Sequence, residues 1–181
     1  MSRTHGPHRR YAISNAAAFN ARATFTWTSD RLYRIYVTDG KLFFVRIGGQ
    51  GGMEMAVAGS FGMLGALFLH AAKSRSDRKQ QSQLTVLDQQ HPQELLCAHK
   101  HSFSLAPGDV VSSSIEPASV AMHGLHVGSW ILSLLDGQKW TLQFEDLDDM
   151  RVALELLPPL LGSRLQVNAQ WNEQKKRFEK N

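Results

Sequence analysis

Residues 130–144, WILSLLDGQKWTLQF, decide the fold class, because they form two alternating apolar runs around a turn-forming Asp-Gly pair. A three-residue loop, Leu135-Asp136-Gly137, places the apolar side chains of both runs on one face; these are Trp130, Leu132, Leu134, Trp140, Leu142 and Phe144. A two-residue loop would put the two apolar sets out of phase, since a one-residue slip moves a whole set to the other face. The stretch therefore predicts an antiparallel β-hairpin with one buried face.

The same reasoning applies to an earlier hairpin, residues 31–47, whose turn contains Thr38-Asp39-Gly40. If Thr38 joins the loop, the apolar residues of both strands share one face, and this consistent register predicts a three-residue loop. Further strands are expected at residues 24–28, 102–105 and 110–116, with a Pro107-Gly108 turn between the last two. Counting both strands of each hairpin, the chain has about seven strands.

Helical spacing appears after the second hairpin, where Asp146 can cap a helix whose first turn holds the acidic Asp148 and Asp149. The helix is expected to end at Pro158-Pro159, because proline cannot continue the backbone hydrogen-bond pattern. Pro159 can open a second helix, whose apolar residues extend to Phe178. A shorter helix is expected at residues 92–99.

The C-terminal half resembles the end of a pleckstrin-homology-like (PH-like) or GRAM-like domain, with a strand around Val110, Val111 and Ile115, the hairpin 130–144 and then the helix DLDDMRVALELLPPL. The earlier hairpin, RLYRIYVTDGKLFFVRIGG, resembles the first strands of such a domain. The resemblance implies an α+β fold, a bent antiparallel PH-like β-barrel of about seven strands with a C-terminal capping helix. The lysine- and arginine-rich loop of phosphoinositide-binding members is missing from this chain.

Three segments are expected on this basis. Residues 1–22 read as a flexible basic arm, residues 23–157 as the PH-like domain, and residues 158–181 as a C-terminal helix or tail. A large helical insertion at about residues 50–100 is foreign to the basic fold.

The insertion begins with an apolar stretch at residues 53–72, MEMAVAGSFGMLGALFLHAA, whose one formal charge is Glu54. On a helical wheel, bulky residues form one stripe and small residues the opposite one. A transmembrane helix, a helix lying in a membrane surface and a helix buried in protein all fit this pattern. A single span would separate the two hairpins, and an isolated hairpin is marginal in water, so the buried helix is preferred. The candidates for self-association or membrane contact are Ala58, Gly62, Ala66, Phe61 and Phe68.

The formal net charge of +4 favours weak attraction to anionic surfaces. The candidates for ligand or lipid binding are Arg34, Lys41, Arg46, Lys73 and Arg75. The interleaved basic and aromatic residues of single-strand binders are not obvious, so nucleic acid is not an expected partner. The expected partners are a protein, an anionic membrane surface, or a second copy of the chain through residues 53–72.

Cys97, His99 and His101 occupy alternate positions, so in a strand they would share one face and could hold a metal ion. The spacing matches no familiar zinc pattern, and a helix there would scatter the three side chains. No metal or cofactor is therefore expected. Cys97 is the one cysteine, which excludes an intramolecular disulfide, and no apolar signal segment follows the basic N-terminus. Both features favour a cytoplasmic protein, with membrane association as a further option.

The expected function is that of a non-catalytic binding or scaffold domain that contacts protein partners or a membrane surface. The same residues support two alternatives: a small integral membrane protein anchored by residues 53–72, and a metal-dependent enzyme that uses Cys97, His99 and His101. The surroundings of residues 53–72, lipid or protein, separate the first alternative from the expected function.

Overall fold

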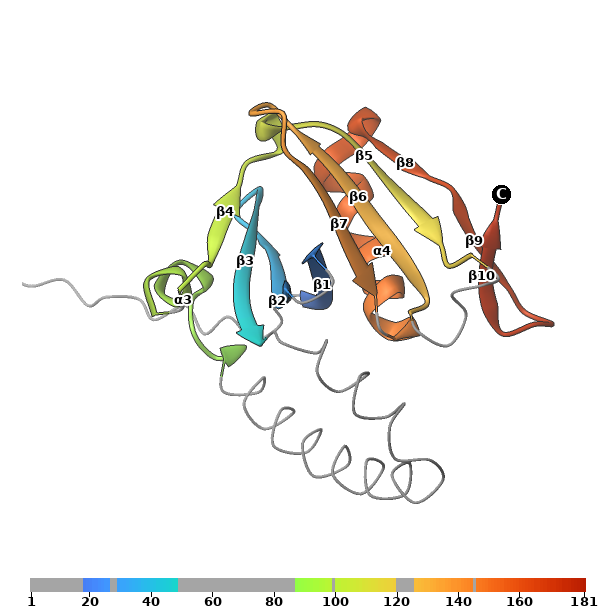
Figure 1. Ribbon diagram of the computed structural model, residues 1–181, viewed down its shortest axis with the longest axis horizontal. Helices are drawn as coiled ribbons and strands as arrows, with labels where there is room; N and C mark the ends of the chain where they lie inside the picture. Colours follow the sequence, from blue (N-terminus) through green and yellow to red (C-terminus); the bar gives the residue numbers. More distant parts are fainter. Residues whose placement is uncertain (1–17, 27–28, 49–86, 99, 120–125, 145) are drawn as a thin grey trace, which may run out of the picture.

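The computed structural model describes residues 18–26, 29–48, 87–98, 100–119, 126–144 and 146–181. These residues form an eight-stranded sheet curled into a half-barrel, one longer helix packed against it, and a two-stranded sheet near the C-terminus (Figure 1). The mixed α+β composition and the barrel-like sheet with a helix near the C-terminus agree with the fold class expected from the sequence.

The elements follow one another as two antiparallel meanders and a C-terminal extension. The first meander is β1 (Ala18–Thr26), β2 (Ser29–Thr38), β3 (Lys41–Gly48), helix α3 (Pro92–Ala98) and β4 (Phe103–Leu105). The second is the 3₁₀ turn η1 (Pro107–Asp109), β5 (Val110–Pro117), β6 (Gly128–Leu134) and β7 (Lys139–Phe144). The extension is α4 (Leu147–Leu161), η3 (Gly162–Arg164), β8 (Leu165–Val167), β9 (Ala169–Asn172) and β10 (Arg177–Lys180).

The two meanders join through a short contact between β1 and β7, which gives the strand order β4-β3-β2-β1-β7-β6-β5-β8. Only Arg22 and Ala23 of β1 pair with β7, opposite Gln143 and Leu142. The remaining strand pairs are antiparallel except β8, which runs parallel to β5. In Figure 1 the first meander and the second lie on either side of β1, with α4 beside the second.

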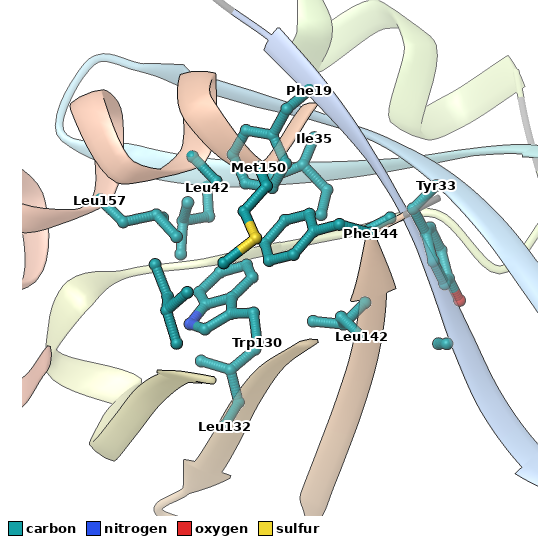
Figure 2. Packing of buried hydrophobic residues seen from close by; sticks show 14 of the residues in the cluster. Phe19, Tyr33, Ile35, Leu42, Trp130, Leu132, Leu142, Phe144, Met150 and Leu157 are labelled. Carbon is teal, nitrogen blue, oxygen red and sulfur yellow. The ribbon is translucent and has the colours of Figure 1, made fainter. Parts of the chain in front are cut away.

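The main core fills the inner face of the curled sheet and is covered by α4 (Figure 2). Phe19 of β1 lies 6.0 Å, between ring centroids, from both Trp130 of β6 and Phe144 of β7, and α4 adds the fully buried Met150 and Leu157. A fully buried aromatic or aliphatic side chain of this size contributes about 1.5–3 kcal/mol to folding. The apolar stripe of α4 therefore fixes the helix on the sheet.

The β6–β7 hairpin has the predicted three-residue loop. Leu134 N–H donates to the Gln138 carbonyl at 2.9 Å, and Gly137 takes the left-handed conformation with φ of 82°. Trp130, Leu132 and their partners across the hairpin point into the core, as the alternating pattern indicates. The sequence prediction for this hairpin is confirmed.

The predicted three-residue loop of the β2–β3 hairpin is wrong. Thr38 pairs with Lys41, so Asp39 and Gly40 alone form the loop, both with positive φ (51° and 68°). The prediction assumed that one face of this hairpin is polar, but both faces are buried. Ile35 lies in the main core, whereas Tyr36 on the opposite face lies in a second cluster under α3.

The predictions for the C-terminal region are wrong in two respects. α4 continues through Pro158 and Pro159 to Leu161, because prolines in the last turn cost few backbone hydrogen bonds. Strands β8, β9 and β10 replace the expected second helix. The alternation of apolar residues at odd positions from 165 to 171 supports this extended backbone, and Trp171 stacks edge-on against Phe178 across the β9–β10 pair, with ring centroids 5.2 Å apart.

The first strand begins at Ala18, inside the segment that was expected to be a flexible arm. Its inward residues Phe19, Ala21 and Ala23 are buried, so small alanines at these positions let the strand pack closely against its neighbours. The short helix expected at residues 92–99 is present as α3. No helix within the described residues is long and apolar enough to cross a bilayer, and residues 53–72 lie outside that part of the chain.

Candidate anion-binding surface

The basic residues that the sequence singled out on the β2–β3 hairpin lie apart from one another. Arg34 points to the outer face of the sheet, where its Nη2 and Nε donate to the two carboxylate oxygens of Asp88 at 2.8 and 3.2 Å. Lys41 is exposed beside the two-residue turn. Arg46 lies toward the other end of β3 and is cross-strand partner to the inward-facing Tyr33. Of the three, Arg46 alone belongs to a larger group of basic residues.

Arg46 lies close to Arg31 of β2 and to Lys100 and His101, which precede β4. Desolvation and then the positive charges of Arg31, Lys100 and Arg46 lower the pKa of His101. We call these four residues the His101 basic cluster. Because they come from three separate segments of the chain, the fold itself gathers this positive charge.

Backbone contacts hold the cluster in place. The Tyr33 hydroxyl donates to the His101 carbonyl at 3.4 Å, and His101 itself has a positive φ of 68°. The Arg46 N–H donates to Ser102 Oγ at 3.0 Å, and Arg46 Nε donates to the Gly48 carbonyl at 3.3 Å. The segment that contains Lys100 and His101 is therefore tied to both β2 and β3.

Aromatic rings support the cluster from the inner face of the sheet. Phe103, two residues after His101, stacks on Phe44 with a centroid distance of 4.6 Å. It also lies 5.0 Å from Trp140 of β7 and 5.8 Å from Tyr33 of β2. β4 and β7 are not neighbours in the sheet, so these contacts close the curl of the half-barrel beneath the basic groups.

Sequence reasoning found Arg46 but missed the company it keeps. Arg31 and Lys100 were not singled out, and His101 was assigned to a metal-site alternative. The signal exists only once the register is known: Tyr33 pairs with Arg46, so inward positions at this end of β2 and β3 carry the two arginines. The proximity of residues 100–102 depends on the pairing of β4, which the sequence does not encode locally.

The other sequence candidates fall into two groups. Cys97 is exposed near the end of α3 and His99 lies outside the described residues, as do Lys73, Arg75 and the small and bulky stripes of residues 53–72. Within the described part of the chain, no three His, Cys, Asp or Glu side chains are grouped to hold a metal ion. The acidic residues before α4 cap the helix as expected, since Asp146 Oδ1 accepts from the Asp149 N–H at 2.8 Å.

Comparison with known proteins places the chain in no family. No protein-family model matches it, and no curated protein or solved structure does. The chemistry of the His101 basic cluster must therefore be judged from its own geometry.

Proposed function

We propose that this chain is a non-catalytic, PH-like binding module that docks on an anionic membrane surface through the His101 basic cluster. One observation carries the proposal: four basic side chains from three segments converge so closely that their charges act on His101. The arrangement of a four-strand meander, a three-strand meander and a following helix supports the PH-like part of the proposal.

The size of the expected interaction follows from the charges. Each basic residue held near an anionic bilayer contributes about 1 kcal/mol, and the contribution decays within a Debye length of roughly 8–10 Å. Arg31, Arg46 and Lys100 together then supply about 3 kcal/mol, and His101 adds charge only when it is protonated. Attraction of this size gives peripheral, salt-sensitive and reversible attachment.

The perturbed titratable groups elsewhere have structural partners, which supports a non-catalytic role. The Tyr36 hydroxyl donates to Asp88 at 2.8 Å, and burial raises the pKa of that tyrosine well above its usual value. Glu179 accepts from Lys175 and Arg177 within the β9–β10 hairpin, and these contacts lower its pKa to about 2. Groups held in this way stabilise the fold and do not face a substrate.

Vesicle sedimentation tests the proposal with a matched pair of variants. We expect the protein to sediment with vesicles that contain phosphatidylserine and not with vesicles of phosphatidylcholine alone. Lys100→Gln should weaken binding about fivefold, the equivalent of about 1 kcal/mol. Lys41→Gln removes the same charge from the far end of β3 and should leave binding unchanged.

Two outcomes would overturn the proposal. Equal weakening by Lys100→Gln and Lys41→Gln would show that net charge, and not the cluster, drives attachment. Failure to bind either vesicle, together with a Lys100-dependent complex with an acidic protein, would transfer the surface from a membrane to a protein partner.

A further inference from the structure

A chain of polar side chains crosses the sheet from α4 to the residues that precede α3. Asp149 of α4 accepts from Asn20 of β1, Asn20 accepts from Arg34 of β2, and Arg34 forms its ion pair with Asp88. The hydroxyl of Tyr36 donates to the same carboxylate. We call this chain the Asn20 relay. It is separate from the His101 basic cluster and does not depend on the function proposed above.

Asp149 occupies a gap in the sheet. β1 leaves β7 after Arg22, so the N–H of Asn20 lies beyond the paired residues. The Asp149 Oδ1 accepts from this N–H at 2.6 Å and so replaces the missing strand partner. The carboxyl group is 8% exposed, which makes it a buried acid held at the joint between helix and sheet.

The side-chain amide of Asn20 gives the relay a direction. Its Nδ2 donates to Asp149 Oδ2 at 3.2 Å, while its Oδ1 accepts from Arg34 Nη1, also at 3.2 Å. Arginine only donates, and an ionised carboxylate only accepts, so the amide fits in one orientation. A protonated Asp149 would present a donor to Asn20. The amide would then have to turn, and its Nδ2 would face the guanidinium of Arg34, donor against donor.

Asp88 is the anchor of α3 on the outer face of the sheet. Leu87 and the helix residues Leu95 and Leu96 belong to the second apolar cluster, which covers Tyr36 and its neighbours on β2 and β3. Both oxygens of Asp88 are engaged by Arg34. Loss of alignment in Arg34 therefore weakens the hold on residues 87–98.

Few other charged groups act on Asp149. Asp146 faces it from the same helix, and Arg34 reaches it only through Asn20. β7, which also contacts α4, has no titratable residue from 140 to 144. On α3 the separate titratable group is His91, whose Nε2 lies 3.8 Å from Asp39.

We propose that the Asn20 amide transmits the protonation state of Asp149 to the Arg34–Asp88 ion pair, so that acid loosens α3 and residues 87–91 from the outer face of the sheet.

The sign follows from linkage. Burial and then the charge of Asp146 raise the pKa of Asp149 to about 6, while the donors of Asn20 oppose this rise. When the amide turns, Asp149 stays buried under α4 but loses its side-chain donor. The turned state therefore binds the proton more tightly than the native state, and lowering the pH through about 6 favours it.

Hydrogen–deuterium exchange of the α3 amides, corrected for the intrinsic pH dependence and referenced to β6 amides, measures the effect. From about pH 7.5 to about pH 5 we expect exchange of α3 to rise about tenfold, the weight of one hydrogen bond to a charged group. The Arg34 Nε–H resonance should shift over the same range. Asp149→Asn, whose amide carries a donor where the acid would carry its proton, should show the acid behaviour already at about pH 7.5.

Matched variants separate the relay from other titrations. Asn20→Ala keeps the backbone N–H to Asp149 but removes the amide, so the pH response of α3 should vanish. Asp148→Asn, at the exposed neighbour that pairs with Arg151, should respond as the wild type does, and so should His91→Gln. An unchanged pH response in Asn20→Ala, or a response abolished by His91→Gln, would overturn the proposal.

Discussion

Gly128 is the position where one added methyl group should do the most damage. It opens β6 and pairs with Phe144 of β7 and Pro117 of β5. A Cβ at this position would lie 2.7 Å from both the Glu116 carbonyl oxygen and Met150 Sδ, and 2.9 Å from Met150 Cε. The carbonyl belongs to a paired strand and Met150 is fully buried, so neither can move away cheaply. We expect Gly128→Ala to cost about 3 kcal/mol, the upper part of the range for overpacking.

Thermal unfolding measures this cost directly. For a chain of this length, about 3 kcal/mol corresponds to a fall in Tm of roughly 6–12 °C. Gly108→Ala is the matched control, because a Cβ there meets no atom within 4 Å, and its unfolding free energy should stay within about 0.5 kcal/mol of the wild type. A Gly128→Ala protein as stable as the Gly108→Ala protein would refute the close approach of β6 to α4.

Three further predictions concern the core and α4. Trp130 is fully buried and its Nε1–H has no partner among the described residues, so Trp130→Phe should cost under about 1.5 kcal/mol in urea unfolding, against about 3–5 for Trp130→Ala; equal costs would reveal a partner for the N–H. Asp146→Ala should cost about 1 kcal/mol through the lost cap and should also lower the pKa of Asp149, observable by NMR titration, because the charge of Asp146 raises it. Since the pKa of Asp149 rises from 3.8 to about 6 on folding, its contribution to the free energy of unfolding is largest below about pH 4 and declines by up to about 3 kcal/mol as the pH rises through about 6; urea unfolding of Asp149→Asn should lack this slope.

The β6–β7 hairpin could be predicted because the environment of its two faces differs. Trp130, Leu132 and Leu142 are buried on one side, while Lys139 and Thr141 on the other are exposed. Alternation in the sequence then reports burial directly, and burial fixes the register. The N-cap at Asp146 could be predicted for a similar reason, since its hydrogen bond is local to the chain.

The C-terminal strands and the candidate surface could not be predicted from local pattern. Leu165 and Trp171 fit both a helical period and a strand alternation, and the choice is made by the parallel pairing of β8 with β5. Likewise, Arg31, Lys100 and His101 are scattered in sequence and meet because the chain returns from residues 49–86 to place β4 beside β3. Contacts of this range are decided by tertiary structure and leave little mark on a short window of sequence.

The two Asp-Gly turns show how burial on a distant face selects between local structures. Asp136-Gly137 belongs to a three-residue loop in which glycine alone has positive φ, whereas Asp39 and Gly40 form a two-residue loop with positive φ at both residues. The dipeptide accommodates either turn, so it does not set the register. The register of β2 and β3 satisfies two cores at once, with Ile35 turned inward and Tyr36 turned outward. Tyr36 is buried because α3 and Leu87 cover it, and the relay through Asp88 helps to hold them there. The two-residue turn at Asp39-Gly40 is therefore a consequence of the chain that returns about fifty residues later.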